Sequence, residues 1–128
     1  MRLLSAEWIA ERLRLGSALP EAPGATALVQ HVVEEGPDGT VEYYDDIRDG
    51  RLADSALGRH PTPHAVINYR WPVELAMLRG ELDPVGGVLS GRILIDGDMN
   101  SLLPLVPVLR TSAAIDVQRA LDGLLDPS

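Results

Sequence analysis

Short apolar segments separated by turn signals occupy most of the first half of the chain. The segments 25–35, 40–47 and 51–58 are separated by the sequence Gly-Pro-Asp-Gly and by Asp49-Gly50. Apolar segments of this length between such turns are typical of antiparallel strands in a meander. A fourth segment of the same kind, 64–70, follows a link that two prolines break. We therefore expect strands over these four segments.

Apolar residues at helical spacing mark the two ends of the chain. Ser5 precedes one such segment, which ends at Gly16, and we expect a capped helix there. Ser112 precedes another amphipathic segment, 113–125, and is the expected N-cap of a final helix. Each helix has an apolar side that is available for packing.

The segment between 71 and 110 mixes helix and strand signals. Pro72 suits the first turn of a helix that closes at Gly80, and Asp83, followed by proline, repeats this start signal for a short helix. The segment 91–98 is the clearest strand. The stretch 98–110 is apolar almost all round and holds two prolines, which must kink or break it.

The order of these elements predicts an α+β fold. Strands follow one opening helix, their connections are mostly short, and helices cluster late in the chain. This order favours an antiparallel sheet of about five strands with helices covering one face. A chain of 128 residues is also the size of one domain, so we expect residues 1–128 to form a single unit.

The net charge of the chain limits the classes of partner that it can bind. With 11 basic and 19 acidic residues, the formal net charge is -8, which disfavours nucleic acid and electrostatic adsorption to an anionic membrane. No apolar run approaches the ~20 residues of a transmembrane helix, so we expect no integral membrane contact. Charged residues in the first helical segment interrupt what a signal peptide would need as an apolar run. We expect a soluble cytoplasmic protein.

The composition also excludes several classes of catalytic, metal-binding and cofactor-binding site. The absence of cysteine excludes disulfides, thiolate metal sites and cysteine nucleophiles. Every basic residue is arginine, which excludes a Schiff-base lysine and a phosphate-binding loop lysine. There is no Gly-x-Ser-x-Gly motif and no glycine-rich dinucleotide loop. We expect no cofactor and no catalytic residue.

The three histidines offer little support for a metal site. His60 and His64 are four residues apart, which is ligand spacing on a helix, but prolines between them oppose a helix there. A solvent-exposed loop is the better interpretation, and we expect no metal. His31 falls inside a predicted strand and is expected to be a core or edge residue with its hydrogen bonds satisfied.

Aspartates gather at two places, and turn chemistry accounts for both. Asp45, Asp46 and Asp49 surround a predicted hairpin, while Asp96 and Asp98 flank a glycine. The second of the latter pair is well placed to cap the helix that follows. A hydrolase that uses either member of this pair remains the third and weakest hypothesis for function.

Large apolar residues are unusually dense in two segments, 71–82 and 99–109, which lie on either side of the clearest strand. Some of them must form the core, but the second segment is apolar on nearly all sides, so it is fully buried or lines a space. We expect an apolar cleft in which a hydrophobic small molecule or lipid binds. The candidate ligand-binding residues are Trp71, Leu75, Leu78, Leu82, Ile93, Ile95, Met99, Leu102, Leu103, Val106 and Leu109.

The segment 75–109 combines a helix that ends in a glycine turn, a short helix and glycine, a strand that ends in Gly-Asp, and an apolar helix. The positions that define this order are Met77, Gly80, Leu82, Pro84, Gly91, Ile93, Ile95, Gly97 and Asp98. In this order and spacing the segment resembles the sterol carrier protein type 2 (nonspecific lipid-transfer) family. The resemblance implies a single sterol-carrier-like domain in which a five-stranded sheet and helices enclose an apolar tunnel for sterols, acyl chains or acyl-CoA. It also implies a protein that is not generally an enzyme.

Two functional hypotheses from different classes follow. The leading one is a lipid-binding or lipid-carrier domain that holds its ligand by burial of apolar area, with no covalent step. The alternative is a protein–protein interaction domain of the same fold with a filled core. In that case an apolar patch over 102–109 is the interface of an oligomer, with a homodimer as the expected assembly.

Overall fold

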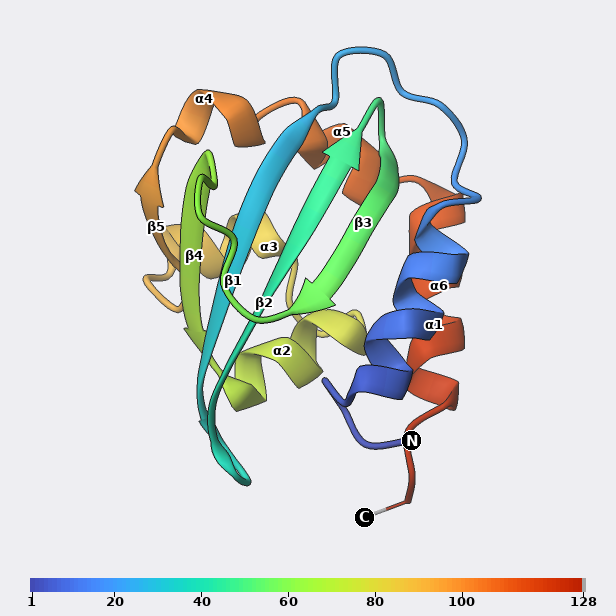
Figure 1. Cartoon of the computed structure of the whole chain (residues 1–128), viewed down its shortest axis with the longest axis vertical. Helices are drawn as coiled ribbons and strands as arrows, with labels where there is room; N and C mark the ends of the chain where they lie inside the picture. The colour runs from blue at the N-terminus through green and yellow to red at the C-terminus, as the bar shows by residue number, and fades with distance from the viewer. Residues whose placement is uncertain (128) are drawn as a thin grey trace.

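The computed structural model describes residues 1–127, over which the chain forms five strands and six helices (Figure 1). The strands are β1 (Ala27–Gly36), β2 (Gly39–Arg48), β3 (Arg51–Leu57), β4 (Ala65–Arg70) and β5 (Leu94–Gly97). The helices are α1 (Ala6–Gly16), α2 (Trp71–Leu78), α3 (Pro84–Leu89), α4 (Met99–Leu102), α5 (Leu105–Leu109) and α6 (Ser112–Gly123). The predicted α+β class is confirmed.

The sheet is mixed, so the prediction of a purely antiparallel sheet was wrong. Its strand order is β3-β2-β1-β4-β5, and all neighbours are antiparallel except β1 and β4, which run parallel. The cause is the link between β3 and β4, which crosses back over the sheet instead of making a hairpin. The buried amide of Gln30 holds this link, because it donates to Gly58 O at 2.9 Å and accepts from His60 N at 2.8 Å.

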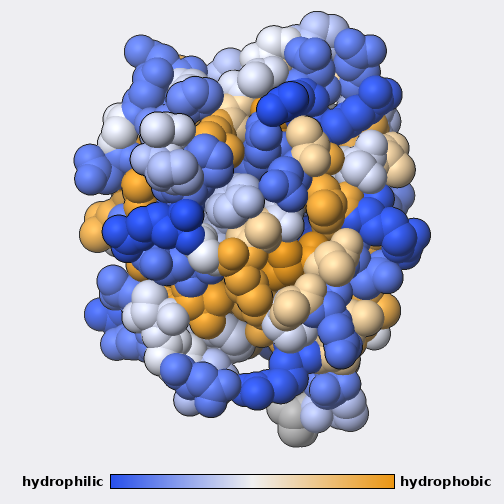
Figure 2. All heavy atoms as spheres, in the orientation of Figure 1, coloured by the Kyte–Doolittle hydropathy of each residue, from blue (hydrophilic) through white to orange (hydrophobic). Residues whose placement is uncertain are grey.

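The helices gather against one side of the sheet and at its β3 edge (Figure 1). Helix α1 packs against β3 and α6, while α2 contacts β1, β4 and α6. In the same view, hydrophobic surface forms a central group inside a largely hydrophilic margin (Figure 2). In residues 1–127, no helix combines the length and the hydropathy that a membrane span requires.

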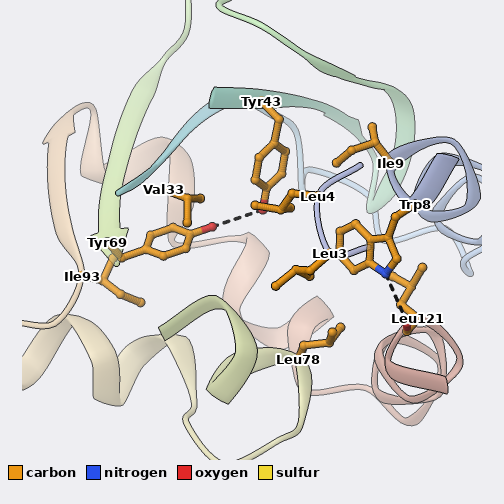
Figure 3. Close-up of a cluster of buried hydrophobic side chains, with 10 residues drawn as sticks. All are labelled: Leu3, Leu4, Trp8, Ile9, Val33, Tyr43, Tyr69, Leu78, Ile93 and Leu121. Carbon is orange, nitrogen blue, oxygen red and sulfur yellow. Dashed lines mark hydrogen bonds between the residues drawn. The ribbon is translucent and has the colours of Figure 1, made fainter. Parts of the chain in front are cut away.

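The main core joins the two ends of the chain to the centre of the sheet (Figure 3). Trp8 of α1 is 1% exposed, and its indole N–H donates to the carbonyl of Leu121 in α6 at 3.2 Å. A tryptophan buried in this way needs a partner for its one polar group, and the helix backbone supplies it. The contact fixes α1 beside α6 over the helix-covered face.

Capping residues and prolines set the helix boundaries. Ser5 accepts a hydrogen bond from Trp8 N, as predicted for an N-cap. At α6 the prediction was off by one residue, because Thr111 is the N-cap and accepts from Ala114 N. Prolines break the apolar stretch into α4 and α5, as expected, and Pro107 lies in the first turn of α5, where its missing N–H is tolerated.

Strand β5 is shorter than predicted, but its glycine explains where it ends. Gly97 has φ of +109°, and a Cβ there would stand 2.7 Å from the carbonyl oxygen of His64. Only glycine accommodates both the backbone angle and this close approach. Asp98 follows and caps α4 by accepting from Asn100 N, as predicted. The resulting turn brings α4 and α5 over the sheet.

Candidate ligand-binding site

A cavity of about 430 Å³ lies between the sheet and the helices. Every strand and every helix over residues 1–127 contributes at least one side chain to its wall, so the cavity occupies the centre of the fold. Most of the wall is aliphatic. Its volume falls within the roughly 300–1,000 Å³ that is usual for small-molecule sites.

The structure brings eight of the eleven candidate residues together on this cavity. They are Leu78, Ile93, Ile95, Met99, Leu102, Leu103, Val106 and Leu109. Trp71, Leu75 and Leu82 do not line it. Trp71 instead faces a smaller hollow beside Leu3 and Leu4.

Helix α2 shows why the sequence assigned the wrong face to some residues. Glu74, Met77 and Leu78 line the cavity, and their spacing places them on one helix face. Trp71 and Leu75 pack against the main core, to which Leu78 also belongs, but they do not line the cavity. Because α2 is apolar nearly all round, its pattern did not show which of its side chains reach the cavity.

The cavity opens where its wall becomes exposed. Leu89 of α3 is 83% exposed, and Leu103, between α4 and α5, is 56% exposed, yet both line the cavity. Met99 and Leu109 are also exposed lining residues. These four side chains form the mouth of the cavity, and all four are apolar. A hydrophobic molecule therefore meets apolar surface at the entrance.

A buried ion pair lies in the inner wall, where the sequence predicted none. Asp45 on β2 is 2% exposed, and both of its carboxylate oxygens accept hydrogen bonds from the guanidinium of Arg12 on α1. Ser55 and the Nε2 atom of His31 lie 2.9 Å from the same carboxylate. The hairpin-turn interpretation of Asp45 was therefore wrong, because its side chain points inward from the strand.

The two charges of this pair stabilise one another. Burial alone would raise the pKa of Asp45, but the nearby Arg12 charge and His31 lower that pKa to well below the usual carboxyl range. For Arg12 the directions are opposite. Burial alone would lower its pKa, but the nearby Asp45 charge more than reverses this effect, so the pKa of Arg12 lies above its ordinary value. The pair therefore stays ionised inside the fold.

Hydrogen bonds extend from this pair across the sheet to helix α2. The Nδ1 atom of His31 lies 2.9 Å from the hydroxyl of Tyr69, which lies 3.1 Å from the hydroxyl of Tyr43 (Figure 3). The Tyr43 hydroxyl donates to Oε1 of Glu74 at 2.9 Å. The rings of His31 and Tyr43 stack with centroids 4.1 Å apart. The cavity wall thus holds a continuous polar network from α1 to α2.

Both tyrosines in this network remain protonated. Burial raises the pKa of Tyr43 and of Tyr69 well above its ordinary value, and the neighbouring Glu74 carboxylate adds to both shifts. Their hydroxyls are therefore hydrogen-bond donors at neutral pH. The prediction that His31 is a core residue with its hydrogen bonds satisfied is confirmed.

The other polar candidates lie away from the cavity. His60 and His64 are in the loop between β3 and β4, where each ring accepts from a backbone N–H, of Thr62 and Leu28 respectively. No group of histidine and carboxylate side chains within residues 1–127 is arranged to hold a metal ion. Asp96 and Asp98 do not line the cavity.

Several solved structures share this fold. A conserved hypothetical protein from Thermus thermophilus, described as possibly a sterol carrier protein, aligns over 100% of this chain and 94% of its own, with a TM-score of 0.76 and 18% identity. A sterol carrier protein 2 crystal structure aligns over 94% and 97%, with a TM-score of 0.70 and 15% identity. A palmitated sterol-carrier-like protein from Aedes aegypti aligns over 84% and 96%, with a TM-score of 0.64 and 21% identity.

The fold also occurs as part of a larger enzyme. A sec-alkylsulfatase from Pseudomonas aligns over 80% of this chain but only 15% of its own length, with a TM-score of 0.54 and 20% identity. The sequence itself matches no protein-family model and no curated protein. The likeness is therefore one of architecture, and at that level the resemblance seen in residues 75–109 is confirmed: the chain has the sterol carrier protein 2 fold.

Proposed function

We propose that this chain binds a lipid or a similar hydrophobic small molecule in the central cavity and carries it without covalent chemistry. The observation that carries the proposal is the cavity of about 430 Å³, with an apolar wall and an apolar mouth. The proposed ligand-binding residues are the eight candidates that line it. The solved structure of a palmitated protein with this fold supports the same interpretation.

The energetics favour an occupied or open cavity over an empty sealed one. At about 24 cal/mol per Å³, an empty cavity of about 430 Å³ would cost roughly 10 kcal/mol. This cost is comparable with the whole stability of a small domain, about 5–15 kcal/mol. Burial of a methylene group returns about 0.8 kcal/mol, so a ligand chain of about ten carbons would offset most of the cost.

The alternative of an interaction domain with a filled core has less support. Its main requirement, close packing of the interior, does not fit a cavity of this size. The exposed leucines at the mouth also have a role in the carrier proposal, as the entrance for the ligand. Leu105, which the interaction hypothesis places in an interface, is 8% exposed and packs against Ala27 and Val29 within the fold.

Tryptophan fluorescence provides a direct test. The chain has two tryptophans, of which Trp8 lines the cavity and Trp71 does not. In a Trp71→Phe variant, titration with a neutral long-chain ligand is expected to change the emission of Trp8 and to saturate at one ligand per chain. A matched titration with hexane-1,6-diol, which is too polar to gain from burial, is expected to give no change. Absence of any saturable change with the long-chain ligand would contradict the proposal.

A further inference from the structure

The Glu74 carboxylate is a buried acceptor in the cavity wall. Glu74 is 7% exposed and lines the cavity from α2. A carboxylate can accept about four hydrogen bonds, and this one has two tyrosine neighbours, with Tyr43 donating to Oε1 at 2.9 Å and the Tyr69 hydroxyl close by. Every fully buried side-chain oxygen and nitrogen within residues 1–127 has a partner. Because Glu74 lies on the cavity wall and its carboxylate has acceptor capacity to spare, a donor on a ligand can approach it.

The cation in the same wall is already engaged. Arg12 uses both terminal nitrogens on the two oxygens of Asp45 and donates to Ser55 as well, at 3.1 Å. A ligand anion would have to displace Asp45 from this bidentate pair. The charges of Arg12 and Asp45 cancel, which leaves the negative charge of Glu74 at the polar end of the cavity. The remaining polar side chain on the cavity, apart from His31 and the tyrosines, is the neutral amide of Gln118.

From these observations we infer that Glu74 accepts a hydrogen bond from a hydroxyl group at the polar end of the ligand, and that it thereby selects long-chain alcohols over the corresponding carboxylates. The inference rests on the proposed function and specifies its ligand class. A hydroxyl offers this carboxylate a further donor, whereas a ligand carboxylate would meet a like charge at low dielectric. An ammonium group would lose its hydration for a single acceptor, which does not repay the cost of burying the charge.

The exposed and buried parts of the wall give the ligand an orientation. Most of the polar groups come from α1, α2 and the central strands, and His31, Asp45 and Glu74 among them are buried, whereas the fully exposed lining residues at the mouth are all apolar. The hydroxyl therefore lies inside, against Glu74, and the hydrocarbon points toward Leu89 and Leu103. This orientation leaves hydrocarbon, and not the polar group, at the entrance.

A competition experiment tests the selection. The neutral probe N-phenyl-1-naphthylamine is bound to the protein at pH 7.5 and displaced with 1-decanol, decanoate or decylamine, which share one chain length. Decanol is expected to displace the probe at a concentration at least about tenfold lower than decanoate, since the charge-assisted hydrogen bond alone amounts to about a factor of ten and the like-charge contact acts in the same direction. Equal potency of decanoate, or tighter binding of decylamine, would overturn the inference. Failure of all three ligands would instead contradict the proposed function.

Variants separate the effect of Glu74 from the ordinary difference in solvation between an alcohol and a carboxylate. In Glu74→Gln the carbonyl still accepts from Tyr43, but the charge is gone, so the preference for decanol is expected to fall by about threefold or more. Glu81→Gln, at an exposed carboxylate just beyond α2, is the matched control and should keep the preference. Glu74→Asp keeps the negative charge but moves it back from the cavity by one methylene length. This variant should still bind decanoate poorly, and its affinity for decanol should fall. An unchanged preference in Glu74→Gln, or acceptance of decanoate by Glu74→Asp, would refute the role of Glu74.

Discussion

Arg12 in α1 and Asp45 in β2 form a bidentate ion pair that ties the first helix to the centre of the sheet. Asp45→Asn removes the negative charge and leaves the half-buried guanidinium of Arg12 without this counter-charge. We expect a loss of about 3–5 kcal/mol in the free energy of unfolding, measured with urea. Asp38→Asn, which breaks a pair on the surface with Arg2, is the control and should cost less than about 1 kcal/mol. Equal losses in the free energy of unfolding would show that the Arg12–Asp45 pair stabilises the fold no more than a surface pair does.

The pH dependence of stability provides a second test of the same pair. The folded-state pKa of Asp45 is lowered below its unfolded value of about 4, so its contribution to stability is complete above that pH. As the pH falls below about 4, the unfolded chain takes up the proton first and the contribution is progressively lost. We expect wild type to lose stability steeply between about pH 4 and pH 2, and Asp45→Asn to lose less over that range. Parallel curves for the two proteins would contradict the assignment.

Filling the cavity should separate ligand binding from stability. Val106 in α5 is half-buried and lines the cavity, so Val106→Trp places a large ring in the space proposed for the ligand. Affinity for N-phenyl-1-naphthylamine is expected to fall at least tenfold, while the urea midpoint stays the same or rises, since a filled cavity no longer costs energy. Val66→Trp, on the opposite face of β4 from the cavity-lining Ile67, is the matched control and should retain probe binding. Undiminished binding by Val106→Trp would place the ligand elsewhere.

Two leucines in the apolar stretch distinguish the core from the surface. Leu105 is 8% exposed and Leu103 is 56% exposed. Leu105→Asp buries an unpaired charge and is expected to destabilise the fold by about 3 kcal/mol or more, whereas Leu103→Asp should stay within about 0.5 kcal/mol of wild type. Sedimentation of Leu103→Asp then tests the homodimer hypothesis without disturbing the core. We expect its sedimentation coefficient to equal that of wild type, and dissociation of a dimer would support the alternative function.

The sequence predicted local features well because their causes are local. Ser5 and Asp98 cap helices through contacts within a few residues, and prolines restrict the backbone wherever they occur. The parallel pairing of β1 with β4 instead joins strands that are distant in the sequence, and the amide of Gln30 holds the link between β3 and β4 by a hydrogen bond to Gly58. A meander and a crossover share the same strand pattern, so the pattern alone favoured the commoner antiparallel arrangement.

The candidate site was predicted in part for the same reason. Eight aliphatic residues on one part of the cavity wall, within the segment 78–109, were identified from the sequence, whereas the aliphatic residues contributed by the strands β1–β4 and by α6 were missed. The polar side is assembled from α1, β1, β2, β4 and α2, which are far apart in the chain. One signal was present: His31 alternates with Val29 and Val33, which places a polar residue on the inward face of its strand. A histidine side chain that points into the fold needs hydrogen-bond partners there, and Asp45 is one of them.

The most direct measurement of the central claim is native mass spectrometry of the protein purified from cells without detergent, followed by solvent extraction and identification of any bound molecule. The account predicts a population with one hydrophobic ligand per chain, which is lost on extraction and absent from Val106→Trp. A wild-type protein that carries no ligand after purification, and takes up none when incubated with long-chain alcohols, would contradict it.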